Sequence, residues 1–215
     1  MYQTTSKPLA TFFGKYPTEQ LKKGTLIHRP GQRPTALHYI EHGYVKLYAL
    51  SPDGAEKLLV ILMPGELFSL SATLQSLPTS FYAQALTAVR LRSAPRDEFL
   101  DFIHSNSQIL DDVIAVLTKT ITVLNNRVFT LSLTRAYDRL ISRLQALVEL
   151  FGVLQPNGNI RIAVPLTHQE IANSINLSRE STSKALYRLQ KEGVLSYHNG
   201  NIVVHKPQVL SGPTT

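Results

Sequence analysis

The sequence predicts an α+β fold with three parts: an antiparallel β-roll (residues 1–105), one long helix (106–132) and a helix-turn-helix followed by a β-hairpin (133–215). Three observations predict this order. Short β-rich runs separated by Gly and Pro come first, a seven-residue apolar repeat follows, and two short helical patterns joined by a tight turn come last. With 215 residues, 43% of them hydrophobic, the chain is long enough for one large or two small domains, each able to bury a core.

Six β-rich runs account for the first part. They cover residues 25–28, 37–41, 44–50, 56–62, 81–86 and 89–93. Gly and Pro lie between them, where glycine supplies the positive φ of tight turns and proline presets their first residue. Runs of this length with this punctuation are typical of an antiparallel roll.

A heptad pattern accounts for the long helix. Its leucines and β-branched residues each recur every seven positions: Leu110, Ile114, Leu117, Ile121, Leu124, Val128 and Leu131. β-Branched residues at a with Leu at d favour a parallel two-stranded coiled coil, so a homodimer interface is predicted on this face. The alternative is a helix packed on its own roll. Val113 and Val116 widen the apolar face, which indicates contact with both.

Capping signals define the last part. Thr167 and Glu170 form a capping-box pattern at the start of a first helix, and Ser178 is placed to cap a second one that ends at Gly193. Asn199-Gly200 then has the composition of a type I′ hairpin turn. A helix-turn-helix with such a hairpin is a winged helix-turn-helix domain.

The second helix of that domain carries the candidate DNA-reading residues. The residues expected to be exposed near its start are Arg179, Glu180, Ser183 and Lys184. Arginine can donate two hydrogen bonds to guanine, glutamate can accept one from cytosine, and lysine can reach guanine or a phosphate. Six more residues lie where backbone phosphates would pass: Thr167, His168, Gln169, Ser178, Ser181 and Thr182. The alternative is that Arg179 and Glu180 only solvate the helix.

The charge distribution supports a polyanionic partner. The chain has 22 Lys and Arg against 15 Asp and Glu, and residues 133–215 hold 9 basic and 5 acidic residues, a local excess of +4. A basic last third suits double-stranded DNA. The competing interpretation is a small-molecule sensor whose winged helix contacts other proteins.

The order of these parts, the run SRESTSKAL at residues 178–186 and the glycines Gly24, Gly31, Gly43, Gly54 and Gly65 resemble the catabolite activator and fumarate–nitrate regulator superfamily of bacterial transcription factors. The resemblance implies a cyclic-nucleotide-binding-like roll, a homodimer on DNA, a palindromic site with a TGA-like core, and RNA polymerase as a partner. Lys184 stands where the family more often has arginine, and lysine lacks the planar fork that pairs with guanine.

The effector site departs from the cyclic-nucleotide pattern. Gly65-Glu66-Leu67 matches the first half of the family's motif, but no Lys or Arg lies between Lys57 and Arg90 to neutralise a phosphate. Cyclic AMP is therefore disfavoured, because a buried anion without a charge partner is costly. The expected pocket residues are Ser69, Leu70, Ser71, Ser80, Phe81, Leu124 and Asn125. They suit a neutral effector, or they fill the pocket themselves and leave the protein constitutively active.

Other functions find little support in the sequence. There is no cysteine, and His28, His38 and His42 lack metal-ligand spacing, so no metal or other cofactor is expected, with haem bound through a single histidine as the alternative. No phosphate-binding glycine loop or nucleophile elbow is present, which predicts a protein that is not an enzyme. No apolar run is long enough to span a membrane, so a cytoplasmic protein without a membrane partner is expected.

Overall fold

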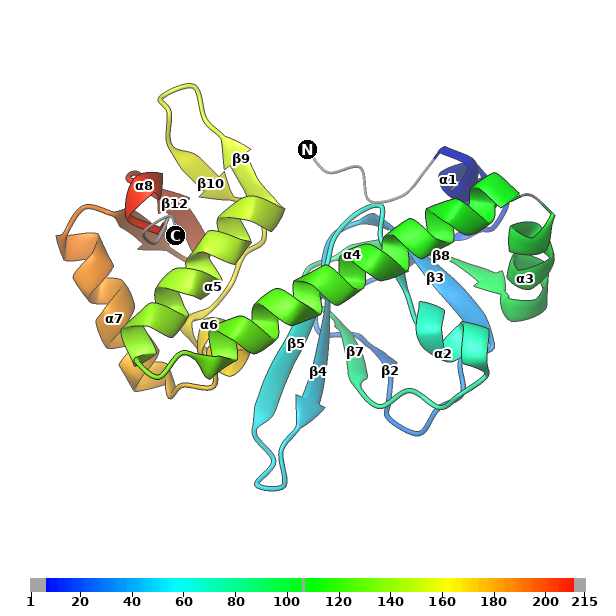
Figure 1. Ribbon diagram of the computed structural model, residues 1–215, viewed down its shortest axis with the longest axis horizontal. Helices are drawn as coiled ribbons and strands as arrows, with labels where there is room; N and C mark the ends of the chain where they lie inside the picture. The colour runs from blue at the N-terminus through cyan, green and yellow to red at the C-terminus, as the bar shows by residue number, and fades with distance from the viewer. Residues whose placement is uncertain (1–6, 106, 211–215) are drawn as a thin grey trace. The chain divides into compact units, whose positions relative to one another are not determined.

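The computed structural model describes residues 7–105 and 107–210, which form two compact units. The division falls between Thr122 and Val123, inside helix α4 (Ser107–Ser132). The long helix therefore contributes residues to both units. Residues 1–6, 106 and 211–215 of the expected ranges lie outside the described residues. Figure 1 shows the elements of each unit.

The first unit contains the predicted roll, built from two four-stranded antiparallel sheets. One sheet has the order β1 (Thr18–Leu21), β8 (Val89–Pro95), β3 (Ala36–His42) and β6 (Leu67–Phe68). The other has the order β2 (Leu26–His28), β7 (Tyr82–Ala85), β4 (Val45–Leu50) and β5 (Glu56–Leu62). Both sheets contribute to one core, which contains Ile40, Val45, Leu47, Phe68, Ala83, Ala85, Val89 and Leu91.

The turn between β3 and β4 requires glycine. Gly43 has φ +84°, and a Cβ atom built there would lie 2.1 Å from the carbonyl oxygen of Ala88. Any larger residue would combine an unfavourable left-handed backbone with a clash against another backbone. The glycine thus fixes both the turn and its close approach to the segment before β8.

Three helices of the first unit were not predicted: α1 (Lys7–Gly14), α2 (Leu70–Gln75) and α3 (Arg96–His104). They form a second core with the start of α4, through Leu9, Phe13, Phe99, Ile103, Ile109 and Val113 among others. The ring of Phe12 stacks on Phe102, with centroids 4.2 Å apart. This core holds the first turns of α4 on the roll.

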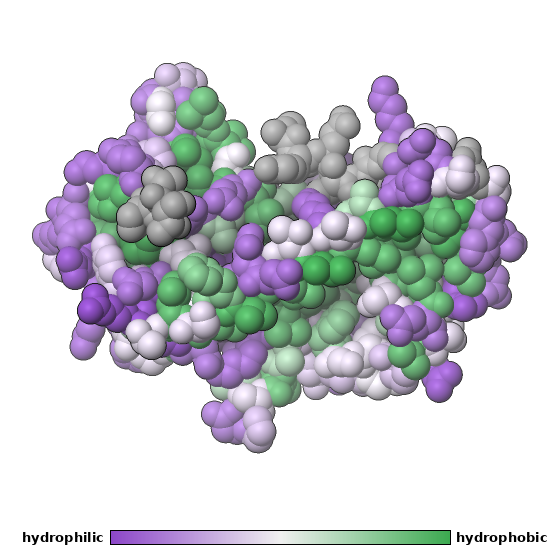
Figure 2. All heavy atoms as spheres, viewed as in Figure 1, coloured by the Kyte–Doolittle hydropathy of each residue, from purple (hydrophilic) through white to green (hydrophobic). Residues whose placement is uncertain are grey.

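Helix α4 divides its apolar residues between two faces. Val113 is buried, and Val116 and Leu117 pack partly buried on the α1–α3 core. The other six residues of the heptad pattern, Leu110, Ile114, Ile121, Leu124, Val128 and Leu131, are 37–68% exposed. Hydrophobic side chains line α4 in Figure 2. Leu117 therefore packs against the roll, although the heptad pattern also assigns it to the predicted dimer interface.

The second unit adds α5 (Ala136–Phe151), α6 (His168–Ile175), α7 (Arg179–Lys191) and α8 (Pro207–Leu210) to a sheet of order β11 (Leu195–His198), β12 (Asn201–Val204), β10 (Ile160–Ile162) and β9 (Gly152–Leu154). Its buried residues include Leu140, Leu144, Leu147, Ile171, Ile175, Leu186 and Leu189. The edge strand β9 was not predicted, and its Leu154 is 74% exposed. Within residues 7–105 and 107–210, no helix combines the length and apolarity needed to cross a membrane.

Candidate nucleic-acid interface

Helix α6 begins at the predicted capping box. The Thr167 hydroxyl accepts a hydrogen bond from the Glu170 backbone N–H at 3.1 Å, and the Glu170 carboxylate accepts one from the Thr167 backbone N–H at 2.7 Å. The reciprocal bonds satisfy N–H groups that a helix start leaves without intrahelical partners. They fix where α6 begins and how its first residues face.

A three-residue turn joins α6 to α7. Asn176 ends α6 in the left-handed region with φ +57°, a conformation that asparagine tolerates better than most residues. The Ser178 hydroxyl then caps α7 by accepting from the Ser181 backbone N–H at 3.1 Å. This is the predicted helix-turn-helix. Its geometry follows from three polar residues that begin or end its helices, namely Thr167, Asn176 and Ser178.

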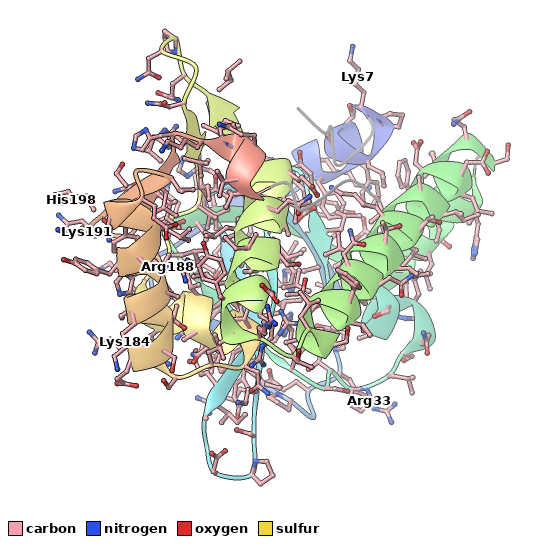
Figure 3. The ribbon with its side chains drawn as sticks, turned by 60° about the vertical axis from the view of Figure 1, so that its left-hand side comes forward. Lys7, Arg33, Lys184, Arg188, Lys191 and His198 are labelled. Carbon is pink, nitrogen blue, oxygen red and sulfur yellow. The ribbon has the colours of Figure 1, made fainter. Side chains whose placement is uncertain are left out.

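Three charged side chains project from the start of α7 without internal partners. Arg179, Glu180 and Lys184 are all exposed, and none makes an ion pair or a side-chain hydrogen bond within the part of the chain that the structure describes. Near the end of the helix the situation differs, because Arg188 pairs with Glu192 at 2.7 Å and lies 4.8 Å above the Tyr137 ring of α5. In Figure 3 Lys184 and Lys191 point outward from α7, while Arg188 lies toward α5.

Ser183 is less available than the sequence indicated. Its hydroxyl lies 2.8 Å from Nδ1 of His168, whose ring centroid is 4.3 Å from that of Tyr197. The Tyr197 hydroxyl in turn donates to the Leu166 carbonyl at 3.0 Å. Burial and then the charge of Arg179 lower the pKa of His168, so the ring is neutral near pH 7. His168, on α6, therefore contacts both α7 and β11, one strand of the hairpin that forms the wing.

Thr182 does not lie on the surface. Its side chain is fully buried together with Leu186 and Leu189, and its hydroxyl has no hydrogen-bond partner among the described residues. The expectation that Thr182 contacts a backbone phosphate is wrong, because residues 182, 186 and 189 share the face of α7 that packs inward. The other expected phosphate contacts, Thr167, Gln169, Ser178 and Ser181, are exposed, and His168 is partly buried.

The expected effector residues of the first unit lie at two places. Ser69 and Leu70 are buried where α2 begins, Ser71 is exposed, and Ser80 and Phe81 precede β7. Ser69 has φ +67° and a buried hydroxyl without a partner among the described residues. Leu124 and Asn125 belong to the second unit. Their place in one pocket with the α2 residues stays a prediction.

A lysine near the glycine–glutamate motif was missed in the sequence. Lys119 of α4 lies with its Nζ 3.2 Å from Oε1 of Glu66, and the other carboxylate oxygen of Glu66 accepts from the Met63 backbone N–H at 3.0 Å. Lys119 lies on the long helix, far along the chain from the segment between Lys57 and Arg90 that contains Glu66. Its charge is already neutralised by Glu66.

The histidines pair across the two sheets of the roll. Nε2 of His28 on β2 lies 2.9 Å from Nε2 of His38 on β3, and Nδ1 of His38 lies 2.8 Å from the Ser93 hydroxyl. Burial, with a smaller effect of His28, lowers the pKa of His38 to about 3. His28 and His38 thus lie on strands of different sheets. Among the residues that the structure describes, no three His, Cys, Asp or Glu side chains gather as a metal site would require.

Comparison with known proteins places both units. Residues 18–106 match the family model of the cyclic nucleotide-binding domain, and residues 138–212 match that of the Crp-like helix-turn-helix domain. Together with the capped helix-turn-helix, they define a transcription regulator with a DNA-binding helix-turn-helix domain and an N-terminal domain of the cyclic-nucleotide-binding type.

Relatives that match this chain over most of their length are transcription regulators of the same class. A CRP-like cAMP-activated global transcriptional regulator of Mycobacterium tuberculosis is 28% identical over 189 residues, covering 88% of this chain and 84% of that protein. The global nitrogen regulator of Nostoc sp. is 29% identical over 220 residues, covering 98% of each. The solved structure of FixK2 from Bradyrhizobium japonicum shares the fold, with TM-score 0.80 and 20% identity over 91% of this chain and 96% of that one.

The chain belongs to the catabolite activator and fumarate–nitrate regulator (CRP/FNR) superfamily. Its members are transcription regulators and not enzymes.

Proposed function

We propose that this regulator acts as a homodimer whose two α7 helices read the halves of a palindromic site with a TGA-like core. The observation that carries the proposal is that Arg179, Glu180 and Lys184, at the start of a capped helix, are exposed and unpaired within residues 7–105 and 107–210. Their side chains can bind bases, because they form no ion pair or side-chain hydrogen bond with other described residues.

Each group has a chemical role in such a site. The Arg179 guanidinium matches the two acceptors of guanine, the Glu180 carboxylate accepts from a cytosine amino group, and Lys184 reaches guanine or a phosphate. Exposed Thr167, Gln169, Ser178 and Ser181 suit phosphate contacts, which orient a protein on DNA without reading sequence. In this proposal Ser183 contributes through its bond to His168, which holds α7 against α6.

The dimer is proposed to form through α4. Its exposed residues Leu110, Ile114, Ile121, Leu124, Val128 and Leu131 recur at the positions that a parallel two-stranded coiled coil buries. A two-fold dimer presents its recognition helices to half-sites about 34 Å apart, one turn of DNA. This requirement explains why the expected site is a palindrome.

The effector is proposed to be neutral and not cyclic AMP. The relative from Mycobacterium tuberculosis is named as cAMP-activated, but residues 58–89 of this chain contain no Lys or Arg. Lys119 does not replace the missing charge, since Glu66 already holds its ammonium at 3.2 Å. We further propose that the protein acts in the cytoplasm and contacts RNA polymerase at promoters.

Fluorescence anisotropy with the full-length protein tests the DNA-reading proposal. A duplex with a palindromic TGA-type site is compared with a scrambled duplex across a salt series, with and without cyclic AMP. We expect Arg179→Ala to weaken specific binding by about 1–3 kcal/mol and to leave binding to the scrambled duplex nearly unchanged. Lys191→Ala, in the last turn of α7, is the matched control that keeps sequence preference.

Three outcomes count against the proposal. A uniform loss on both duplexes in Arg179→Ala would remove that arginine from base reading. A requirement for cyclic AMP would overturn the proposed effector class. An absence of sequence preference under all conditions would favour the competing interpretation, in which the winged helix contacts proteins.

A further inference from the structure

Two arginines lie near the contact between the last turns of α4 and the first half of α5. Arg127 lies on α4 and Arg143 on α5, and the same two helices are joined by a 2.7 Å hydrogen bond between the hydroxyls of Thr130 and Ser142. Burial, and in addition the positive charge of Arg127, lower the pKa of Arg143 to about 10. The positive charges of the two guanidinium groups therefore repel each other, and both side chains are partly buried.

These cations lack counter-charges among the residues that the structure describes. Nε of Arg143 and Nε of Arg139, one helical turn earlier, are buried without a hydrogen-bond partner among the described residues. Arg139 uses one other nitrogen, Nη1, to donate to the Ile175 carbonyl at 3.3 Å. Within residues 7–105 and 107–210 no carboxylate forms an ion pair with any of the three arginines. Buried like charges with unused donors are unfavourable unless an anion joins them.

A second copy of the chain does not supply that anion through α4. Residues 113–137 contain no Asp or Glu, so a parallel twin helix brings no carboxylate to the level of Arg127. The nearest acidic residue along α5 is Asp138, which is exposed and unpaired with these arginines. Neither a parallel α4 helix nor Asp138 therefore supplies the missing counter-charge.

We propose that Arg127, Arg139 and Arg143 form a binding site for a small phosphate-type oxyanion at the junction of α4 and α5. A guanidinium group offers a planar fork of donors that matches two phosphate oxygens at once. A dianion with several oxygens can accept from more than one such fork and neutralises two of the three charges. Inorganic phosphates and the phosphate groups of nucleotides share this chemistry. The site uses none of the residues proposed to contact DNA or an effector, and it stands whether or not the proposed DNA sequence is correct.

Isothermal titration calorimetry of the full-length protein with pyrophosphate, at constant ionic strength set with chloride, tests the site. We expect saturable binding that is at least about tenfold weaker in Arg143→Gln and in Arg127→Gln, since each loses charge-assisted hydrogen bonds. Arg33→Gln, which removes an exposed arginine of the first unit, is the matched control and should bind as the unchanged protein does. Adenosine diphosphate and succinate are titrated in parallel.

Thermal unfolding of the same proteins gives a second readout. Pyrophosphate should raise the midpoint of the unchanged protein and of Arg33→Gln but not those of the two site variants. Without the anion, Arg127→Gln should unfold at the same temperature as the unchanged protein or higher, because one of two like charges is gone. Tighter binding of adenosine diphosphate would identify nucleotides as the source of the phosphate group. Equal effects of pyrophosphate on all four proteins, or tighter binding of succinate, would overturn the proposal.

Discussion

The partly buried pair of His28 and His38 makes the stability of the roll depend on pH. His38 has a pKa of about 3 in the folded protein, against an ordinary value of 6.5. Below pH 6.5 His38 therefore binds a proton in the unfolded chain but not in the folded one, and the free energy of unfolding falls as the pH falls. Each pH unit in this window costs about 1.4 kcal/mol, so the loss from His38 between pH 7 and pH 5 is about 2 kcal/mol. His28, whose pKa is also lowered by burial, changes stability in the same direction.

Urea unfolding followed by circular dichroism at pH 7, 6 and 5 measures this loss. Carboxylates remain ionised over this range, so histidines dominate the change. His38→Gln keeps a polar side chain that does not titrate, and we expect its free energy of unfolding to fall by about 2 kcal/mol less than that of the unchanged protein between pH 7 and pH 5. A parallel decline in the two proteins would refute the reasoning, whatever the absolute stability of the variant.

Three further predictions concern single contacts. Gly43→Ala should destabilise the roll by at least about 2 kcal/mol in urea unfolding, while Gly54→Ala, with φ +83° but no atom within 4 Å of its Cβ, should cost less; equal costs would exclude the contact with Ala88 as a cause. Thr182→Val should stabilise the protein by about 1 kcal/mol without changing DNA affinity, because it removes a buried hydroxyl that has no partner in the described part of the chain; a loss of affinity would return Thr182 to the interface. Val128→Asp should shift the protein from dimer to monomer in sedimentation equilibrium with unchanged circular dichroism, and a persistent dimer would place the interface elsewhere.

Local signals in the sequence predicted much of the fold. The strands β3, β4, β5 and β8 were expected within two residues of their ends, because Gly and Pro mark the turns around them. Helices α6 and α7 were predicted from their caps, which are set by residues three positions apart. Strand β9 was not predicted because it follows α5 directly and has only three residues, which is too short for an alternating pattern to be recognised.

Contacts between distant residues could not be predicted in this way. The pair Lys119–Glu66 joins residues 53 positions apart, and His28 meets His38 only because two sheets face each other. Thr182 was misplaced for a different reason. Its polarity indicated a surface position, although its spacing from Leu186 and Leu189 already matched the buried face of α7. In this case the helical period was a better guide than the side-chain type.

The exposed edge at β9 has a consequence for how the protein behaves at high concentration. Val153 and Leu154 are 41% and 74% exposed, and the unpaired side of β9 offers backbone donors and acceptors to any strand that approaches it. Such an edge is a template for aggregation when it is long and flat. Here it is only three residues long, and Pro156 follows two positions after its end, so it cannot be extended. Substituting Pro156 would remove this limit, and self-association through added strands is the failure to expect in such a variant.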